Sequence, residues 1–157
     1  MILFQGGIMA VMKEKTWERH ANPISGFTRI ITYPFVYIPL WFLAEFLEDP
    51  LTHWYVAVLG ILVIIWFAVN PRLFKKPANF HHYMSRGVLG EKLWTEDRKK
   101  DTFATTLSVL TAPFFFISLY TSYLQFFWET MFFATVPFLL KLWFIDRMVF
   151  LYDHEKS

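Results

Sequence analysis

The sequence predicts an all-α integral membrane protein in which four transmembrane helices form two antiparallel hairpins. Hydrophobic residues make up 55% of the 157 residues and aromatic residues 21%, more apolar surface than a soluble domain of this size can bury. Four mostly apolar stretches approach the roughly 20 residues that a membrane-spanning helix needs. The 15 Lys and Arg residues all lie outside the two short turns that join these stretches in pairs.

The four expected spans are residues 30–47, 51–69, 102–124 and 126–145. The third contains no charged residue, whereas the fourth carries Glu129 and Lys141. Prolines occur within the spans and would argue against helices in a soluble protein, but in membrane helices they are tolerated and usually cause kinks. Because the turns between the first and second spans and between the third and fourth are short, each pair is expected to form a hairpin within one domain, 1–157.

Two polar segments complete the chain. Residues 1–29 are expected to lie on the inner membrane surface, with Met9 and Met12 as alternative start positions to Met1. Residues 70–101 form a long loop in which the Asn70-Pro71 pair is expected to stop the second span. Within this loop, apolar residues at helical spacing predict an interfacial amphipathic helix. They are Val88, Leu89, Leu93 and Trp94.

The distribution of basic residues predicts the orientation. Lys and Arg precede the first span, fill the long loop and follow the middle of the fourth span. The positive-inside rule then places both termini and residues 70–101 in the cytoplasm, and the chain in the cytoplasmic membrane. Lys141, about one turn inside the membrane, is expected to snorkel to the inner surface.

Composition excludes several classes of function. A net charge of +2 is too small to indicate nucleic-acid binding, and the absence of cysteine excludes disulfides, thiolate metal sites and a cysteine nucleophile. The sequence contains no nucleophile elbow, glycine-rich phosphate loop or zinc-protease motif. The expected partners are therefore membrane lipids, and either other membrane subunits or further copies of the chain.

Four motifs in order carry a resemblance to a known family. They are Trp17-Glu18-Arg19-His20-Ala21-Asn22-Pro23, then Asn70-Pro71-Arg72, then Val88-Leu89-Gly90-Glu91 with Trp94, and Trp143-Phe144-Ile145-Asp146-Arg147-Met148-Val149 with Tyr152. In these the chain resembles a family of small bacterial and archaeal multi-pass membrane proteins of unknown function. The resemblance covers nearly the whole chain but implies no catalytic or binding residue.

The polar residues near the inner surface supply two candidate sites. For catalysis, His20 is a candidate acid or base, with Glu91 or Asp146 to orient it. For anion binding, arginine side chains could converge on a phosphate or carboxylate, although arginines on this face also serve topology and lipid contact. The candidate anion-binding residues are Arg29, Asn70, Arg72, Arg86 and Arg147.

A metal site has less support. His81 and His82 are the candidate ligands, but adjacent histidines seldom point the same way on a helix, and no pair of ligands is spaced to share one helical face. The sequence therefore predicts no metal ion and leaves any cofactor open.

Three functions are compatible with these observations. The leading hypothesis is a non-catalytic protein that binds lipid or serves as an accessory subunit of a membrane complex. The alternative is a small membrane enzyme that acts on a lipid-like or anionic amphipathic substrate at the cytoplasmic face. An oligomeric transporter is the third, because four helices alone offer little polar lining for a path.

Overall fold

A computed structural model of the chain describes residues 14–157 and confirms the all-α class, since it contains no strand within that range. The helices are α1 (Glu14–His20), α2 (Pro23–Thr32), the 3-10 helix η1 (Tyr33–Val36), α3 (Tyr37–Trp41), α4 (Leu43–Glu48), α5 (Trp54–Leu73), α6 (Tyr83–Glu96), the 3-10 helix η2 (Arg98–Lys100), α7 (Thr102–Tyr123) and α8 (Phe127–Lys156). The expectations for residues 1–13, including the choice of start, lie outside the described residues.

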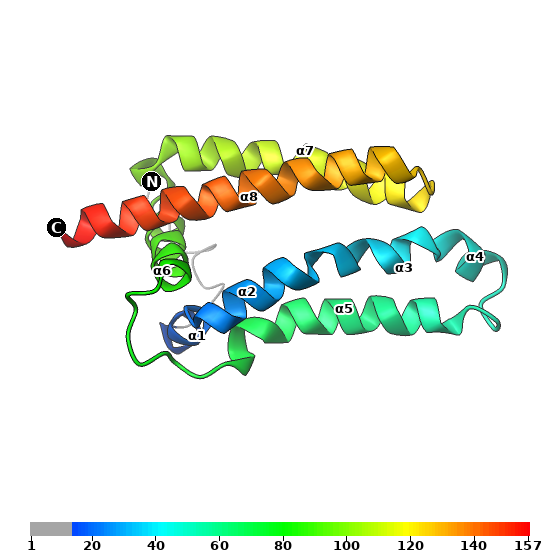
Figure 1. Cartoon of the computed structure of the whole chain (residues 1–157), viewed down its shortest axis with the longest axis horizontal. Coiled ribbons are helices and arrows are strands. Elements are labelled where there is room, and N and C mark those ends of the chain that lie inside the picture. The colour runs from blue at the N-terminus through cyan, green and yellow to red at the C-terminus, as the bar shows by residue number, and fades with distance from the viewer. Residues whose placement is uncertain (1–13) are drawn as a thin grey trace, which may run out of the picture.

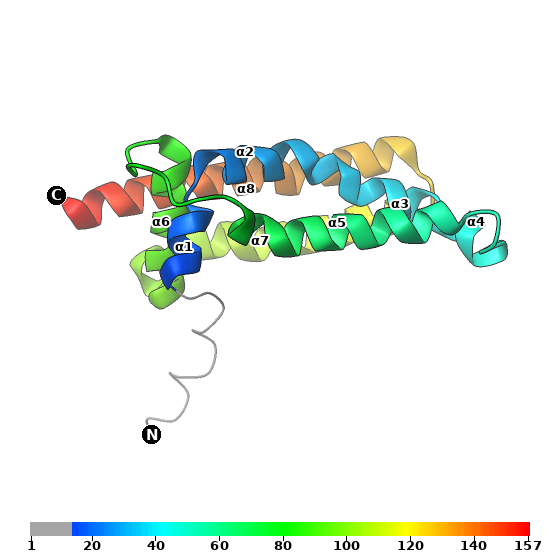
Figure 2. The ribbon, with the colours of Figure 1, turned by 90° about the horizontal axis from the view of Figure 1, so that it is seen from below.

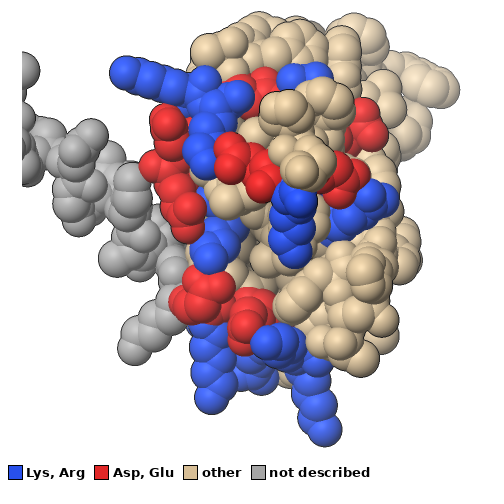
Figure 3. All heavy atoms as spheres, turned by 90° about the vertical axis from the view of Figure 1, so that its left-hand side faces the viewer, with Lys and Arg blue, Asp and Glu red and all other residues tan. Residues whose placement is uncertain are grey.

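The long helices form two antiparallel pairs (Figure 1). In the first hairpin, α2, η1, α3 and α4 run in one direction and α5 returns; in the second, α7 and α8 run side by side. Helix α6 lies across one end of both hairpins, with α1 beside it (Figure 2). We call this end, formed by α1, residues 74–101 and the C-terminal turns of α8, the charged end. Figure 3 views it directly and shows Lys, Arg, Asp and Glu side chains gathered on it.

The sequence predicts one continuous helix over residues 30–47, but the first arm of the first hairpin is broken there. It is divided into short segments, with Pro34 at the start of η1 and Pro39 inside α3. Proline has no backbone N–H and its ring crowds the carbonyl four residues earlier, which interrupts an α-helix. A second break follows at Phe42, whose φ of −101° and ψ of 10° separate α3 from α4.

Two other helices end later than expected. Helix α5 continues through the Asn70-Pro71 pair to Leu73, because a proline in the last turn removes only one hydrogen bond from the helix. Helix α8 continues past Ile145 to Lys156. Its last turns stay helical because Met148, Leu151 and other apolar residues there are buried.

Two described helices, α5 and α7, are long and apolar enough to cross a membrane. Only 11% of the apolar window of α5 and 17% of that of α7 is buried inside the protein, unlike the mostly buried core helix of a soluble domain. The other two expected spans do not meet the same criterion. The first is divided into short helices, and the fourth carries Glu129 and Lys141 within its expected span.

Glycines allow α6 to pack directly on α8. A Cβ added to Gly90 would lie 1.9 Å from the carbonyl oxygen of Met148, and one added to Gly87 would lie 2.9 Å from the Ile145 Cγ2. The backbones of the two helices are therefore in near contact. Beside this contact lies the apolar core of the charged end, formed by Trp94, Ala104, Leu107, Phe144, Met148 and Leu151.

At the opposite end, a row of hydrogen bonds joins the two hairpins. The Tyr37 hydroxyl and Ser118 Oγ are 3.0 Å apart, and the Ser122 hydroxyl donates to the Tyr37 carbonyl at 3.1 Å. The Gln125 amide donates to the Trp41 carbonyl at 2.9 Å and to Glu45 Oε1 at 2.6 Å. The breaks in the first arm leave these carbonyls available to side chains. We call this row the polar seam.

Candidate functional site

A cavity of about 260 Å³ lies between the two hairpins and α6. Most of its wall is apolar, and its charged side chains are Arg29 of α2, Glu91 of α6 and Lys141 of α8. The hydroxyl-bearing residues on its wall are Tyr33 and Thr111. The remaining lining residues are Gly26, Ile30, Phe67, Met84, Gly87, Val88, Pro137, Phe138, Leu142 and Ile145. A mostly apolar pocket with a few convergent polar groups is the usual form of a small-molecule site.

Lys141 and Glu91 form an ion pair in the cavity wall. The Lys141 Nζ lies 3.1 Å from Glu91 Oε1 and 4.4 Å from the centre of the Phe144 ring. Burial alone would raise the pKa of Glu91, but the Lys141 ammonium, assisted by His20 and Arg29, brings that pKa below its ordinary value. Glu91 is therefore a carboxylate at neutral pH, and Lys141 is its counter-ion.

Arg29 enters the same cavity from α2. Its Nε donates to the Ser25 carbonyl at 3.1 Å, which fixes the side chain along the helix. Its two terminal nitrogens form no hydrogen bond or ion pair with any residue of 14–157. Gly26, three residues earlier, leaves room beside Arg29 for Met84, since a Cβ there would lie 2.5 Å from the Met84 Cε. The cavity wall therefore contains two cations and one carboxylate.

His20 lies close enough to Arg29, Glu91 and Lys141 for their charges to affect its pKa, but it makes no hydrogen bond to them. Its side chain is 5% exposed, its Nδ1 has no partner among the described residues, and the Trp17 ring packs on it with centroids 6.0 Å apart. Burial, with a further contribution from Arg29 that outweighs the opposing effect of Glu91, lowers the pKa of His20 to about 4. His20 is therefore neutral at physiological pH and adds no positive charge.

Asn70 and Arg72 are not in the cavity. Asn70 is fully buried between α2 and α5, where its Oδ1 accepts from the Ser25 hydroxyl at 2.7 Å and its Nδ2 donates to Thr28 Oγ1 at 3.0 Å. Arg72 is exposed and donates to the Ala68 carbonyl at 2.8 Å. Asn70 thus joins the two arms of the first hairpin, and Arg72 extends from the last turn of α5.

The other two arginines expected to bind an anion have carboxylate partners. Arg147 donates to Asp101 Oδ2 through Nε at 3.0 Å and through Nη2 at 2.7 Å, and Asp101 also caps α7. Arg86 lies 2.6 Å from Asp153. The structure therefore does not bring the four arginines together, and only Arg29 lines the cavity.

The remaining candidates are also dispersed. Asp146 accepts a hydrogen bond from the Tyr83 hydroxyl at 3.1 Å and forms none with His20. His82 caps α6, where its Nδ1 accepts from the Met84 N–H at 3.1 Å, while His81 is exposed. No group of three or more His, Asp or Glu residues within 14–157 is arranged to hold a metal ion.

Sequence reasoning placed Lys141 at the membrane surface and did not consider Tyr33. The signal for Lys141 was present, because a charge inside an apolar segment most often faces the protein interior and pairs with another charge. Its partner Glu91 lies 50 residues away in the sequence, in α6. No pattern in the sequence indicates that α6 turns Glu91 toward α8.

Comparison with known proteins gives one match. No curated protein and no solved structure matches the chain. A family model described as a family of unknown function, DUF6653, matches residues 8–157. This agrees with the resemblance carried by the four motifs, at the level of an uncharacterised family. The chain therefore belongs to the family of unknown function DUF6653.

Proposed function

We propose that the chain is an integral membrane protein that binds an amphipathic anion in the cavity between its hairpins. In this proposal the polypeptide crosses the membrane four times, with the charged end in the cytoplasm. The anionic group lies at Arg29, and the apolar part lies against the remaining cavity wall. Such a protein binds a lipid-like molecule without needing a catalytic group.

The outward faces of the helices support the membrane part of the proposal. Large apolar side chains on α5 and α7 are widely exposed, among them Ile64 at 71% and Phe116 at 66%. The partner arms expose similar side chains, including Phe35 in η1 and Phe132 in α8. Apolar surface of this extent is compatible with lipid and unfavourable in water.

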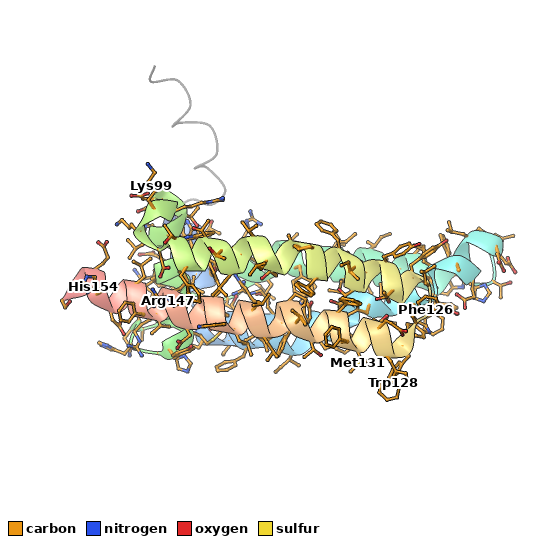
Figure 4. All side chains as sticks on the ribbon, turned by 90° about the horizontal axis from the view of Figure 1, so that it is seen from above. Lys99, Phe126, Trp128, Met131, Arg147 and His154 are labelled. Carbon is orange, nitrogen blue, oxygen red and sulfur yellow. The ribbon has the colours of Figure 1, made fainter. Side chains whose placement is uncertain are left out.

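The charge distribution supports the orientation. Described Lys and Arg residues belong to α1, α2, the last turn of α5, residues 74–101 and the part of α8 from Lys141 onward. None lies near the turns at the opposite end. Figure 4 shows Lys99, Arg147 and His154 at the charged end, and Phe126, Trp128 and Met131 at the other. The positive-inside rule assigns the basic end to the cytoplasm.

Single cysteines test the crossings directly, because the chain has none of its own. Thr52→Cys and Phe126→Cys should react with a membrane-impermeant maleimide in intact cells. Asn79→Cys and Ser157→Cys should react only after the cells are opened. Were only α5 and α7 to cross, the C-terminus would lie outside, and reaction of Ser157→Cys in intact cells would contradict four crossings.

The excess of positive charge in the cavity carries the binding proposal. Glu91 compensates Lys141, whereas the terminal nitrogens of Arg29 have no partner within 14–157. An uncompensated charge in apolar surroundings is unfavourable, so a bound anion would stabilise the protein. The apolar part of the cavity wall beside Arg29 could contact the apolar part of such a ligand.

Native mass spectrometry of protein extracted in a mild non-ionic detergent tests this binding. The wild-type protein should carry a discrete additional small-molecule mass, and Arg29→Gln should lose it. Arg72→Gln is the matched control, since Arg72 is exposed and donates only to a backbone carbonyl. Equal retention by both variants would contradict a site at Arg29. The same spectra report whether the chain is extracted alone, as an oligomer or with another subunit.

A further inference from the structure

We infer that the molecule bound in the cavity is a single-chain monocarboxylate of the fatty-acid type. This inference rests on the proposed function and specifies its ligand. It follows from the number of charges in the cavity, the atoms that Arg29 offers and the size and composition of the wall.

The charged side chains of the cavity, Arg29, Lys141 and Glu91, sum to one positive charge, which a ligand with one negative charge would neutralise. Lys141 is held 3.1 Å from Glu91, and His20 is buried and makes no hydrogen bond through Nδ1 within the described residues. The terminal nitrogens of Arg29 form no hydrogen bond or ion pair there, although Glu91 lines the same cavity. A dianionic phosphate monoester would carry one charge more than Arg29 neutralises. The Glu91 carboxylate in the same cavity repels any anion bound at Arg29, and it repels a dianion about twice as strongly as a monoanion. A carboxylate leaves no such excess.

The geometry of Arg29 favours a planar, two-oxygen group. Its Nε is engaged by the Ser25 carbonyl at 3.1 Å, so the two terminal nitrogens remain for the ligand. A guanidinium binds a carboxylate through two parallel hydrogen bonds, an arrangement that lysine cannot reproduce. Tyr33, four residues later, also lines the cavity.

The rest of the wall is suited to one hydrocarbon chain. Tyr33 and Phe138 are stacked with their ring centroids 5.8 Å apart, and Phe67, Pro137 and Leu142 continue the apolar lining. The Tyr33 hydroxyl is engaged by the Tyr37 hydroxyl at 2.6 Å. The cavity volume of about 260 Å³ falls just below the roughly 300–1,000 Å³ typical of pockets for drug-sized ligands. This volume suits one hydrocarbon chain better than the two chains of a phospholipid.

Three amphiphiles with the same twelve-carbon chain test which headgroup the cavity binds. They are dodecanoate, dodecyl phosphate and the uncharged dodecanol. The full-length protein is placed in phosphatidylcholine nanodiscs at pH 8, and binding is measured by titration calorimetry, with empty nanodiscs to subtract partition into the lipid. Dodecanoate should bind more tightly than the other two. Its affinity should fall about tenfold or more in Arg29→Gln, recover in part in Arg29→Lys, and stay unchanged in Arg72→Gln.

A second readout does not depend on the stability of the variants. Dodecanoate labelled with carbon-13 at the carboxyl group reports its own ionisation in the wild-type protein. The bound acid should stay ionised at pH values at which the acid dissolved in empty nanodiscs takes up its proton, because the guanidinium favours the anion. Protonation of both at the same pH would overturn the inference.

The outcomes also separate this inference from the proposed function. Tighter, Arg29-dependent binding of dodecyl phosphate than of dodecanoate would overturn the monocarboxylate and leave an anion site in place. Binding of dodecanol as strong as that of dodecanoate would overturn both, since no anion would then be required. Absence of any binding above that of empty nanodiscs would likewise overturn both.

Discussion

Gly90 of α6 lies against the backbone of Met148 in α8, so closely that a methyl group on Gly90 would lie 1.9 Å from the Met148 carbonyl oxygen. This contact fixes how far α6 lies from α8. Glu91 is the next residue along α6, and its carboxylate reaches Lys141 of the same α8. The closeness of two backbones thus places the ion pair in the cavity wall.

Gly90→Ala should strongly destabilise the protein. The methyl group would meet backbone atoms that cannot move aside without displacing α6 or α8, and overpacking of this kind costs about 1–3 kcal/mol or more. Gly60→Ala is the control, since the nearest atom to its added Cβ is the Pro39 Cβ at 3.7 Å. Thermal unfolding in detergent should show a lower midpoint for Gly90→Ala alone. Equal midpoints would contradict the close approach.

Asp101 and Arg147 should be energetically coupled. Asp101 is 6% exposed and accepts two hydrogen bonds from the Arg147 guanidinium. Asp101→Asn keeps the ability to cap α7 but removes the charge, so it isolates the ion pair from the cap. A double-mutant cycle with Arg147→Gln should give a coupling free energy of about 1–3 kcal/mol. Additive effects of the two substitutions would exclude this coupling.

Asn70→Ala should lower stability without changing ligand affinity. Removal of the Asn70 amide leaves the buried Ser25 hydroxyl without its acceptor, and an unsatisfied buried group costs about 1–3 kcal/mol. The Thr28 hydroxyl loses the donor Asn70 but still donates to the Ile24 carbonyl. Asn79→Ala, at an exposed position in the loop, is the control. Chemical unfolding measures the first effect and calorimetry with dodecanoate the second. A large loss of affinity in a folded Asn70→Ala protein would instead place Asn70 in the binding site.

His20 should make stability depend on pH. Because the folded protein lowers the pKa of His20 from 6.5 to about 4, the unfolded chain takes up this proton first as pH falls. The stabilisation is therefore complete above pH 6.5 and is lost progressively between pH 6.5 and 4, by about 3 kcal/mol in all. His20→Gln removes the titration, so the difference in unfolding midpoint between the two proteins should vary across this window. A constant difference would contradict a buried neutral histidine.

The all-α class follows from the sequence because long apolar stretches without strand-like alternation leave helices as the stable form. The subdivision of the first arm is harder to foresee. Pro34 and Pro39 are visible in the sequence, yet proline in a membrane helix produces anything from a slight bend to a full break. The break at Phe42 has no proline of its own, and Gln125 of the other hairpin donates a hydrogen bond to the Trp41 carbonyl beside it.

Two of the candidate residues lie in the cavity wall. The sequence names Arg29 as a candidate anion-binding residue and Glu91 as a candidate catalytic residue, and both roles stay predictions. Arg86 and Arg147 were named on the same ground, but each has a carboxylate partner that its sequence neighbours do not reveal. Which arginine remains without such a partner depends on contacts between residues 67 positions apart for Arg86 and 46 for Arg147. Those contacts depend on how α6 and the start of α7 pack against α8.

The two walls of the cavity differ in stiffness, because α6 meets α8 through backbone atoms at Gly90 but meets α2 through the flexible end of Met84. The side of the cavity that holds Glu91 and Lys141 is therefore set by a backbone contact, whereas the side that holds Arg29 can adjust through one flexible side chain. A ligand slightly wider than the cavity would be accommodated by displacement of Met84, and the pair of Glu91 and Lys141 would keep its position.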